Sequence, residues 1–97
     1  MKDITNVHPG AALQEFLEDY ELTQSRLARE IRVPARRISA IIKGERGITA
    51  DTAVRLARYF GNRPDFWLGL QELYDVREAQ NRLADELYMI HPMVSTR

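Results

Sequence analysis

The stretch LTQSRLAREIRVPARRISAIIKG, residues 22–44, decides how this chain folds. Thr23 is a favourable helix N-cap, because its hydroxyl can accept a hydrogen bond from a backbone N–H two or three residues later. Apolar residues at helical spacing follow it, and a second helix begins near Pro34, a residue that is tolerated in a first turn. Gly44 is placed to end that helix in a left-handed conformation. The stretch therefore predicts two short helices joined by a tight turn.

Two short helices joined in this way, through a turn of roughly three to four residues, match the helix-turn-helix motif. Val33 lies in the turn, where an apolar side chain can fill the angle between the helices. Because Ile38 faces inward, a step of about 100° per residue directs Arg36 outward and Arg37 to its flank. Arginines on an exposed helix suit the DNA major groove, where a guanidinium can bond guanine O6 and N7 together. Residues 23–43 are therefore predicted to bind double-stranded DNA.

Three further helices are expected around this motif, and no strand-like alternation is present. They begin near Pro9, Thr49 and Pro64, and the last of them is expected to run to about residue 90. Apolar residues at helical spacing form the predicted inner faces of the first two: Leu13, Phe16, Leu17 and Tyr20, then Ala53, Leu56, Ala57 and Phe60. The expected fold is a single all-α domain over residues 1–97, a five-helix bundle with a long C-terminal helix and a tail at residues 91–97.

The net charge of zero hides a strong asymmetry along the chain. Between Leu22 and Arg63 there are ten basic and three acidic residues, a net charge of +7, and the remainder carries −7. A basic middle between acidic ends indicates a polyanion on one surface and a different partner on another. The alternative is that the arginines simply solvate exposed helix faces, and charge alone does not decide between the two.

Several classes of protein find no support. The chain has no cysteine, which excludes disulfides and thiolate metal sites and suits a reducing cytoplasm. His8 and His91 lack clustered carboxylates and make a poor ligand set, and His8 is expected to shape the start of the first helix instead. No apolar run approaches the roughly 18–20 residues of a membrane span. Phosphate-binding loops, nucleophile elbows and Cys–His pairs are missing, so neither an enzyme nor a cofactor is expected.

The motif and its surroundings together resemble a known family. Residues 22–28 and 33–39 look like the phage-repressor or Cro-type (XRE) helix-turn-helix. A second set of segments resembles the HigA-type antitoxins: His8-Pro9-Gly10, residues 44–53, Phe60-Gly61, Phe66-Trp67-Leu68 and Leu70-Gln71. The resemblance covers roughly residues 8 to 80. It implies a lambda-repressor-like bundle.

Carried over by position, the resemblance also implies the residues that bind DNA: Gln24, Arg36, Arg37, Ser39, Lys43 and Arg46. Of these, Arg36 and Arg37 are expected to enter the groove, and Gln24 and Arg46 to meet phosphate. Arg32 departs from the pattern, since many repressors of this class have a glycine there that adopts a left-handed conformation. A non-glycine residue in that conformation costs roughly 1 kcal/mol, so an altered turn is one expectation.

The implied function is that of a homodimeric repressor on a palindromic operator, which also neutralises a small basic RelE-like ribonuclease toxin. A solitary phage-type regulator without a toxin is the alternative. Dimerisation is assigned to the last helix, which has apolar residues to spare: Trp67, Leu70, Leu73 and Leu83.

Overall fold

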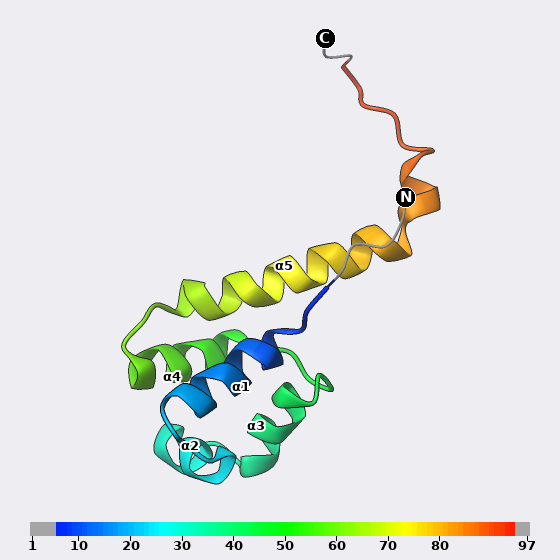
Figure 1. The fold of residues 1–97 in the computed structure, drawn as a ribbon. Helices are drawn as coiled ribbons and strands as arrows, with labels where there is room; N and C mark the ends of the chain where they lie inside the picture. Colours follow the sequence, from blue (N-terminus) through cyan, green and yellow to red (C-terminus); the bar gives the residue numbers. More distant parts are fainter. Residues whose placement is uncertain (1–5, 95–97) are drawn as a thin grey trace.

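The computed structural model describes residues 6–94 of the chain, and in that range it contains six α-helices and no strand (Figure 1). The helices are α1 (Pro9–Asp19), α2 (Gln24–Ile31), α3 (Ala35–Ile42), α4 (Ala50–Phe60), α5 (Pro64–Arg82) and α6 (Ala84–Leu87). The all-helical prediction is confirmed. Part of the predicted C-terminal tail, residues 95–97, lies outside the described range.

The helices form a small bundle with α5 laid across one side of it. α5 packs against α1 and α4, α3 packs against α1 and α2, and α2 also contacts α4. In Figure 1, α2 and α3 lie on the side of the bundle opposite α5, and the segment after α6 extends away from the other helices. α5 therefore does not cover α2 and α3, the two helices predicted to bind DNA.

The helix starts follow the predicted capping residues. The Thr23 hydroxyl accepts from the Arg26 backbone N–H at 3.0 Å, and Thr49 caps α4 through the Thr52 N–H. His8 caps α1, because its Nδ1 accepts from the Gly10 N–H at 2.9 Å. Such caps satisfy backbone donors that the first turn of a helix leaves free. His8 thus shapes the start of α1, as expected from the sequence.

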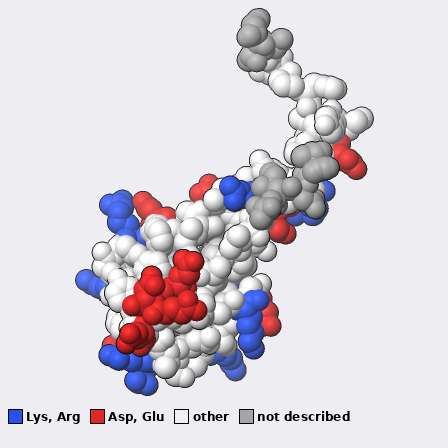
Figure 2. Space-filling model, in the orientation of Figure 1, with Lys and Arg blue, Asp and Glu red and all other residues white. Residues whose placement is uncertain are grey.

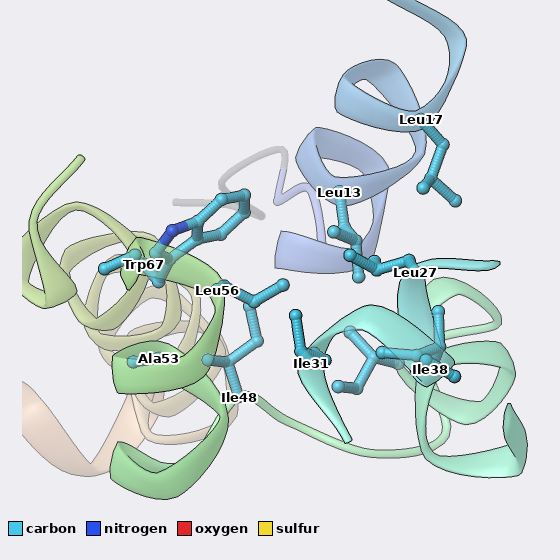
Figure 3. Close-up of a cluster of buried hydrophobic side chains, with 12 residues drawn as sticks. Leu13, Leu17, Leu27, Ile31, Ile38, Ile48, Ala53, Leu56 and Trp67 are labelled. Atoms are coloured by element: carbon cyan, nitrogen blue, oxygen red, sulfur yellow. The ribbon is translucent and has the colours of Figure 1, made fainter. Parts of the chain in front are cut away.

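A single apolar core joins the first five helices (Figure 3). Its fully buried large side chains come from α1 to α5 and are Leu13, Leu27, Ile38, Ile41, Leu56 and Trp67. Trp67 also satisfies its indole N–H by donating to the Asn62 side chain at 3.0 Å. The inner face predicted for α1 is wrong at Tyr20, which is 59% exposed. α1 ends at Asp19 beside it, and the Tyr20 ring packs tilted against Phe16 and Phe60 from outside the core.

The close crossing of α1 and α3 depends on Gly10. A Cβ added at Gly10 would overlap the Ile41 carbonyl oxygen and lie 2.9 Å from the Ile42 Cα, both of them backbone atoms. Backbone cannot move aside as a flexible side chain can, so glycine is required here. The contact fixes the C-terminal half of α3 against the start of α1.

The last helix is shorter than the sequence suggests. α5 ends at Arg82 and not near residue 90, Leu83 forms its C-cap, and one more short helix, α6, follows. No proline or glycine marks this end. The physical reason is the lack of packing in its second half. The one buried residue of α5, Trp67, lies near its start, and a helical segment without a packed face is marginally stable in water.

Candidate nucleic-acid interface

The turn between α2 and α3 keeps the left-handed conformation in spite of the missing glycine. Arg32 has φ 65° and ψ 48° and forms the C-cap of α2. The Val33 N–H donates to the Ala28 carbonyl at 2.9 Å, which closes the turn. The altered turn expected from Arg32 is thus not present, and the strain of a non-glycine residue in this region is retained.

Arg55 of α4 stabilises this turn from outside. Its Nη1 donates to the Ile31 carbonyl at 2.9 Å and to the Arg32 carbonyl at 3.3 Å. These carbonyls lie at the end of α2, where the helix leaves its own acceptors unpaired and a cation is favourable. A sequence pattern does not reveal these bonds, because the partners of Arg55 lie more than twenty residues earlier in the chain.

The outward side of α3 carries three polar side chains, which differ in exposure. Arg36 and Lys43 are exposed, whereas Ser39 is half-buried and its Oγ donates to the Arg36 carbonyl at 3.2 Å. Ile38 and Ile41 are fully buried beneath this side and fix the rotation of the helix. Arg36, at the first turn of α3, is therefore presented to solvent on a rigid support.

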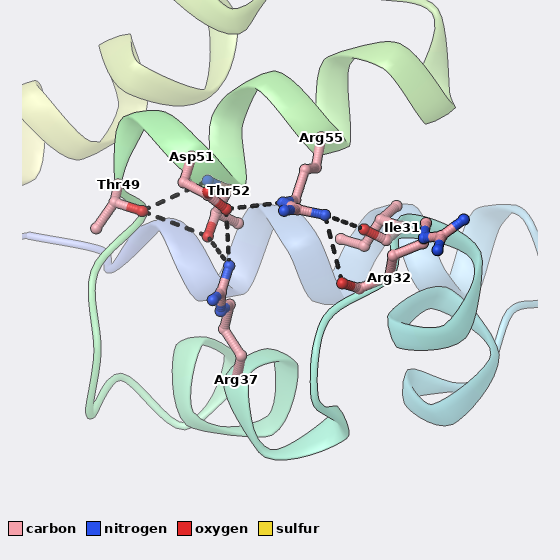
Figure 4. A network of polar contacts seen from close by, with 7 residues as sticks. All are labelled: Ile31, Arg32, Arg37, Thr49, Asp51, Thr52 and Arg55. Atoms are coloured by element: carbon pink, nitrogen blue, oxygen red, sulfur yellow. Dashed lines mark hydrogen bonds and ion pairs between the residues drawn. The ribbon is translucent and has the colours of Figure 1, made fainter.

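Arg37 lies differently from its neighbour. Its side chain is 22% exposed, and its Nη1 donates to the Asp51 carboxylate at 2.9 Å and lies 3.5 Å from the Thr52 hydroxyl (Figure 4). The structure therefore brings Arg36 to the outward face and turns Arg37 toward the start of α4. That both arginines enter a groove stays a prediction from the sequence. The sequence pattern did not indicate the ion pair of Arg37, because the carboxylate comes from another helix.

Asp51 connects α4 to α3 and pairs within α4 with Arg55, the residue that binds the end of α2. Its Oδ1 accepts from Arg55 Nε at 2.8 Å as well as from Arg37 (Figure 4). Hydrogen bonds from Arg55 and then Arg37 lower the pKa of this carboxyl below its usual range, so it remains ionised at neutral pH. One carboxylate thus orients two guanidinium groups, one beside α3 and one beside the turn.

The loop between α3 and α4 carries Arg46, which is exposed. Gln71 of α5 holds this loop, since its Oε1 accepts from the Ile48 N–H at 2.7 Å while its Nε2 donates to Asp75 at 2.9 Å. At the other edge, Gln24 is half-buried in the first turn of α2. Helical periodicity could not reveal the role of Gln71, because its partner is a loop backbone.

The four residues assigned to dimerisation differ in exposure. Trp67 is fully buried in the chain's own core, which leaves it no surface for a partner. Leu70 is half-buried, and Leu73 and Leu83 are 48% and 38% exposed.

Acidic side chains gather over α1. Figure 2 shows them together over α1, with basic side chains at the edges of the same view. The exposed acidic residues there are Glu15, Glu18, Asp19 and Glu21.

In the described residues there is no helix long and apolar enough to cross a membrane and no group of three potential metal-binding side chains.

Comparison with known proteins agrees with this geometry. A family model described as "Helix-turn-helix" matches residues 13–67. Virulence-associated protein I of Dichelobacter nodosus is 44% identical over 76% of the chain and 69% of its own length. An addiction module antidote protein of a HigA family from Coxiella burnetii has a TM-score of 0.85 and 37% identity, over 97% of this chain and 100% of its own. Pseudomonas aeruginosa antitoxin HigA, solved with the higBA promoter, has a TM-score of 0.88 and 35% identity, covering 93% and 100% of the two chains.

Proposed function

The chain belongs to the helix-turn-helix family and, within it, to the HigA-type proteins, and from this premise we propose that it is a DNA-binding antitoxin that represses its own operon. Its action is binding and not catalysis, and it takes place in the cytoplasm, where the operator is. The observation that carries the proposal is the exposed first turn of α3, with Arg36 outward on a buried isoleucine support. A similar chain, the P. aeruginosa antitoxin HigA, has been solved together with the higBA promoter.

The roles of the individual residues follow from their positions. Arg36 enters the major groove and discriminates bases, since a bidentate contact to guanine is worth roughly 1–3 kcal/mol. Gln24 in the first turn of α2 and Arg46 in the loop after α3 contact phosphates, and Ser39 and Lys43 contact the DNA backbone or a flanking base. Phosphate contacts fix register and supply most of the salt-dependent affinity without choosing a sequence.

Two copies are needed for a palindromic operator, whose half-sites lie about 34 Å apart, one helical turn. The exposed apolar residues of α5 and of the segment after it, including Leu73 and Leu83, supply the contact between copies. This surface lies on the side of the bundle away from α2 and α3, so it can pair two chains without covering either recognition helix (Figure 1).

The antitoxin role adds a second partner, a small basic ribonuclease toxin of the RelE type. The acidic face over α1 suits a basic surface, because complementary charge speeds association and selects partners. DNA binding and toxin binding then use different faces of the same chain. A solitary regulator without a toxin would use the DNA-binding face alone.

The test of DNA binding is an Arg36→Ala variant measured against a duplex of the chain's own upstream promoter and a scrambled duplex of equal length. We expect affinity for the promoter to fall by roughly 5- to 150-fold, with little change on scrambled DNA. Arg58→Ala is the matched control, since Arg58 is also an exposed helix arginine but lies at the end of α4. Equal affinity of Arg36→Ala and the unaltered protein for the promoter would refute the role of Arg36.

A further inference from the structure

The two arginines in the first turn of α3 differ in a way that bears on sequence discrimination. Arg36 is exposed and makes no ion pair in the described part of the chain. Arg37 is ion-paired to Asp51, and its Nε is buried without a hydrogen-bond partner among the described residues. The Arg37 guanidinium thus keeps its position against α4 although one of its donors is left unsatisfied there, a condition that has a free-energy cost.

The Asp51 carboxylate that binds Arg37 is itself bound by Arg55. Arg55 donates to the same Asp51 oxygen at 2.8 Å while its Nη1 binds the end of α2, so Asp51 cannot follow Arg37 outward without breaking a second ion pair. The Asp51 side chain is 57% exposed and stays on the surface beside α3 (Figure 4). Two cations and one anion share this cluster, and the anion lies between Arg37 and Arg55.

We propose that Asp51 is a specificity-determining residue that withholds Arg37 from DNA, so that Arg36 is the arginine of this turn that contacts bases. The inference rests on the proposed DNA binding of α3. Arg37 freed from Asp51 would reach a phosphate of any duplex, because a flexible guanidinium near the backbone adds the same contact on every sequence. Asp51 therefore lowers the affinity for non-operator DNA more than the affinity for the operator.

The experiment measures binding of the full chain to the promoter duplex and to the scrambled duplex over a series of salt concentrations. Asp51→Asn is expected to raise affinity for the scrambled duplex about three- to tenfold at low salt and to steepen its salt dependence by about 0.9 in log–log slope, the value of one further phosphate contact. The ratio between promoter and scrambled affinity falls accordingly.

The double variant Asp51→Asn/Arg37→Ala separates this mechanism from a general loss of negative charge. If Arg37 makes the new contact, the double variant returns to the salt slope and scrambled-DNA affinity of Arg37→Ala alone. Persistence of the gain in the double variant would overturn the proposal, because the gain would then not depend on Arg37. Equal weakening on both duplexes by Asp51→Asn, as for a purely structural role, would overturn it as well.

Asp65→Asn is the matched control, since Asp65 is also paired with an arginine, Arg63 at 3.2 Å, but at the start of α5. It is expected to leave both affinities unchanged. The unaltered protein is measured alongside on both duplexes. Absence of any preference for the promoter there refutes the proposed function, whereas a preference that Asp51→Asn does not reduce refutes the role of Asp51 alone.

Discussion

Two halves of the molecule differ in how far their apolar residues are buried. One half presents α3, and the other is formed by the end of α5 and the segment after it. In α2, α3 and α4 the large apolar side chains are buried or half-buried, with Val54 the exception. From α5 onward the exposed ones accumulate: Phe66, Leu73, Val76, Leu83, Leu87, Tyr88, Met89, Ile90, Met93 and Val94. The difference indicates that one chain completes the DNA-facing half by itself. The other half exposes apolar surface of the kind that marks a contact with a second molecule.

The largest effect is expected from a pair of glycine substitutions, one in each half. Gly10→Ala should destabilise the chain by about 1–3 kcal/mol, because the new methyl group would have to displace the α3 backbone. Gly69→Ala in α5 should stabilise it by roughly 0.5–1 kcal/mol, since nothing lies within 4 Å of the new Cβ and alanine favours a helix. Urea unfolding at one fixed protein concentration measures both.

The two substitutions are expected to change the free energy of unfolding in opposite directions. Destabilisation by Gly69→Ala as large as that by Gly10→Ala would mean that α5 is as tightly packed at Gly69 as the α1–α3 crossing is at Gly10. The contrast between the halves would then be wrong.

A smaller effect is expected on association. Leu73→Ala combined with Leu83→Ala should raise the dimer dissociation constant about tenfold or more, because truncating central apolar residues of an interface commonly costs more than 1 kcal/mol. Val54→Ala is the control, an exposed apolar residue of the DNA-facing half. Sedimentation velocity over a dilution series gives the constant. A chain that sediments as an 11.2 kDa monomer without any substitution would refute the assignment of this surface.

Most of the fold was accessible from the sequence, because its signals are local. Thr23 and Thr49 cap helices within three residues, Gly61 ends α4 in a left-handed conformation, and Ile38 and Ile41 are buried at helical spacing. Where local signals were lacking the prediction failed. α5 ends at Arg82 because its second half has no neighbouring helix to pack against. No helix-ending residue near position 82 indicates this in the sequence.

The DNA-facing site was less accessible, for a related reason. The register of α3 follows from its isoleucines, so the exposure of Arg36 could be predicted. Arg36 and Arg37 are chemically identical, and what separates them is Asp51, fourteen residues further along the chain from Arg37. Pairing between distant residues leaves no periodic trace, so a sequence pattern treats both arginines alike.

The smallest effect concerns His8, which connects the two halves. Its Nδ1 caps α1, and its ring packs edge-on against Tyr74 of α5 with 4.8 Å between ring centroids. The cap needs the neutral ring, because a protonated Nδ1 cannot accept from the Gly10 N–H. Burial lowers the pKa of His8 below its ordinary 6.5, and the negative charge of Asp75 opposes this shift only in part.

Because the folded pKa is the lower one, His8 makes no pH-dependent contribution above about pH 6.5, where both states are neutral. As pH falls through that value and then through the folded pKa, the unfolded chain takes up the proton more readily and stability is lost. His8→Asn keeps a good N-cap that does not titrate, so its melting temperature should fall less between about pH 7.5 and pH 5 than that of the unaltered chain. The readout is the difference between the two pH profiles, since loss of the contact with Tyr74 shifts the variant at every pH. Parallel profiles would contradict the prediction, because the folded chain would then take up the proton at His8 as readily as the unfolded chain does.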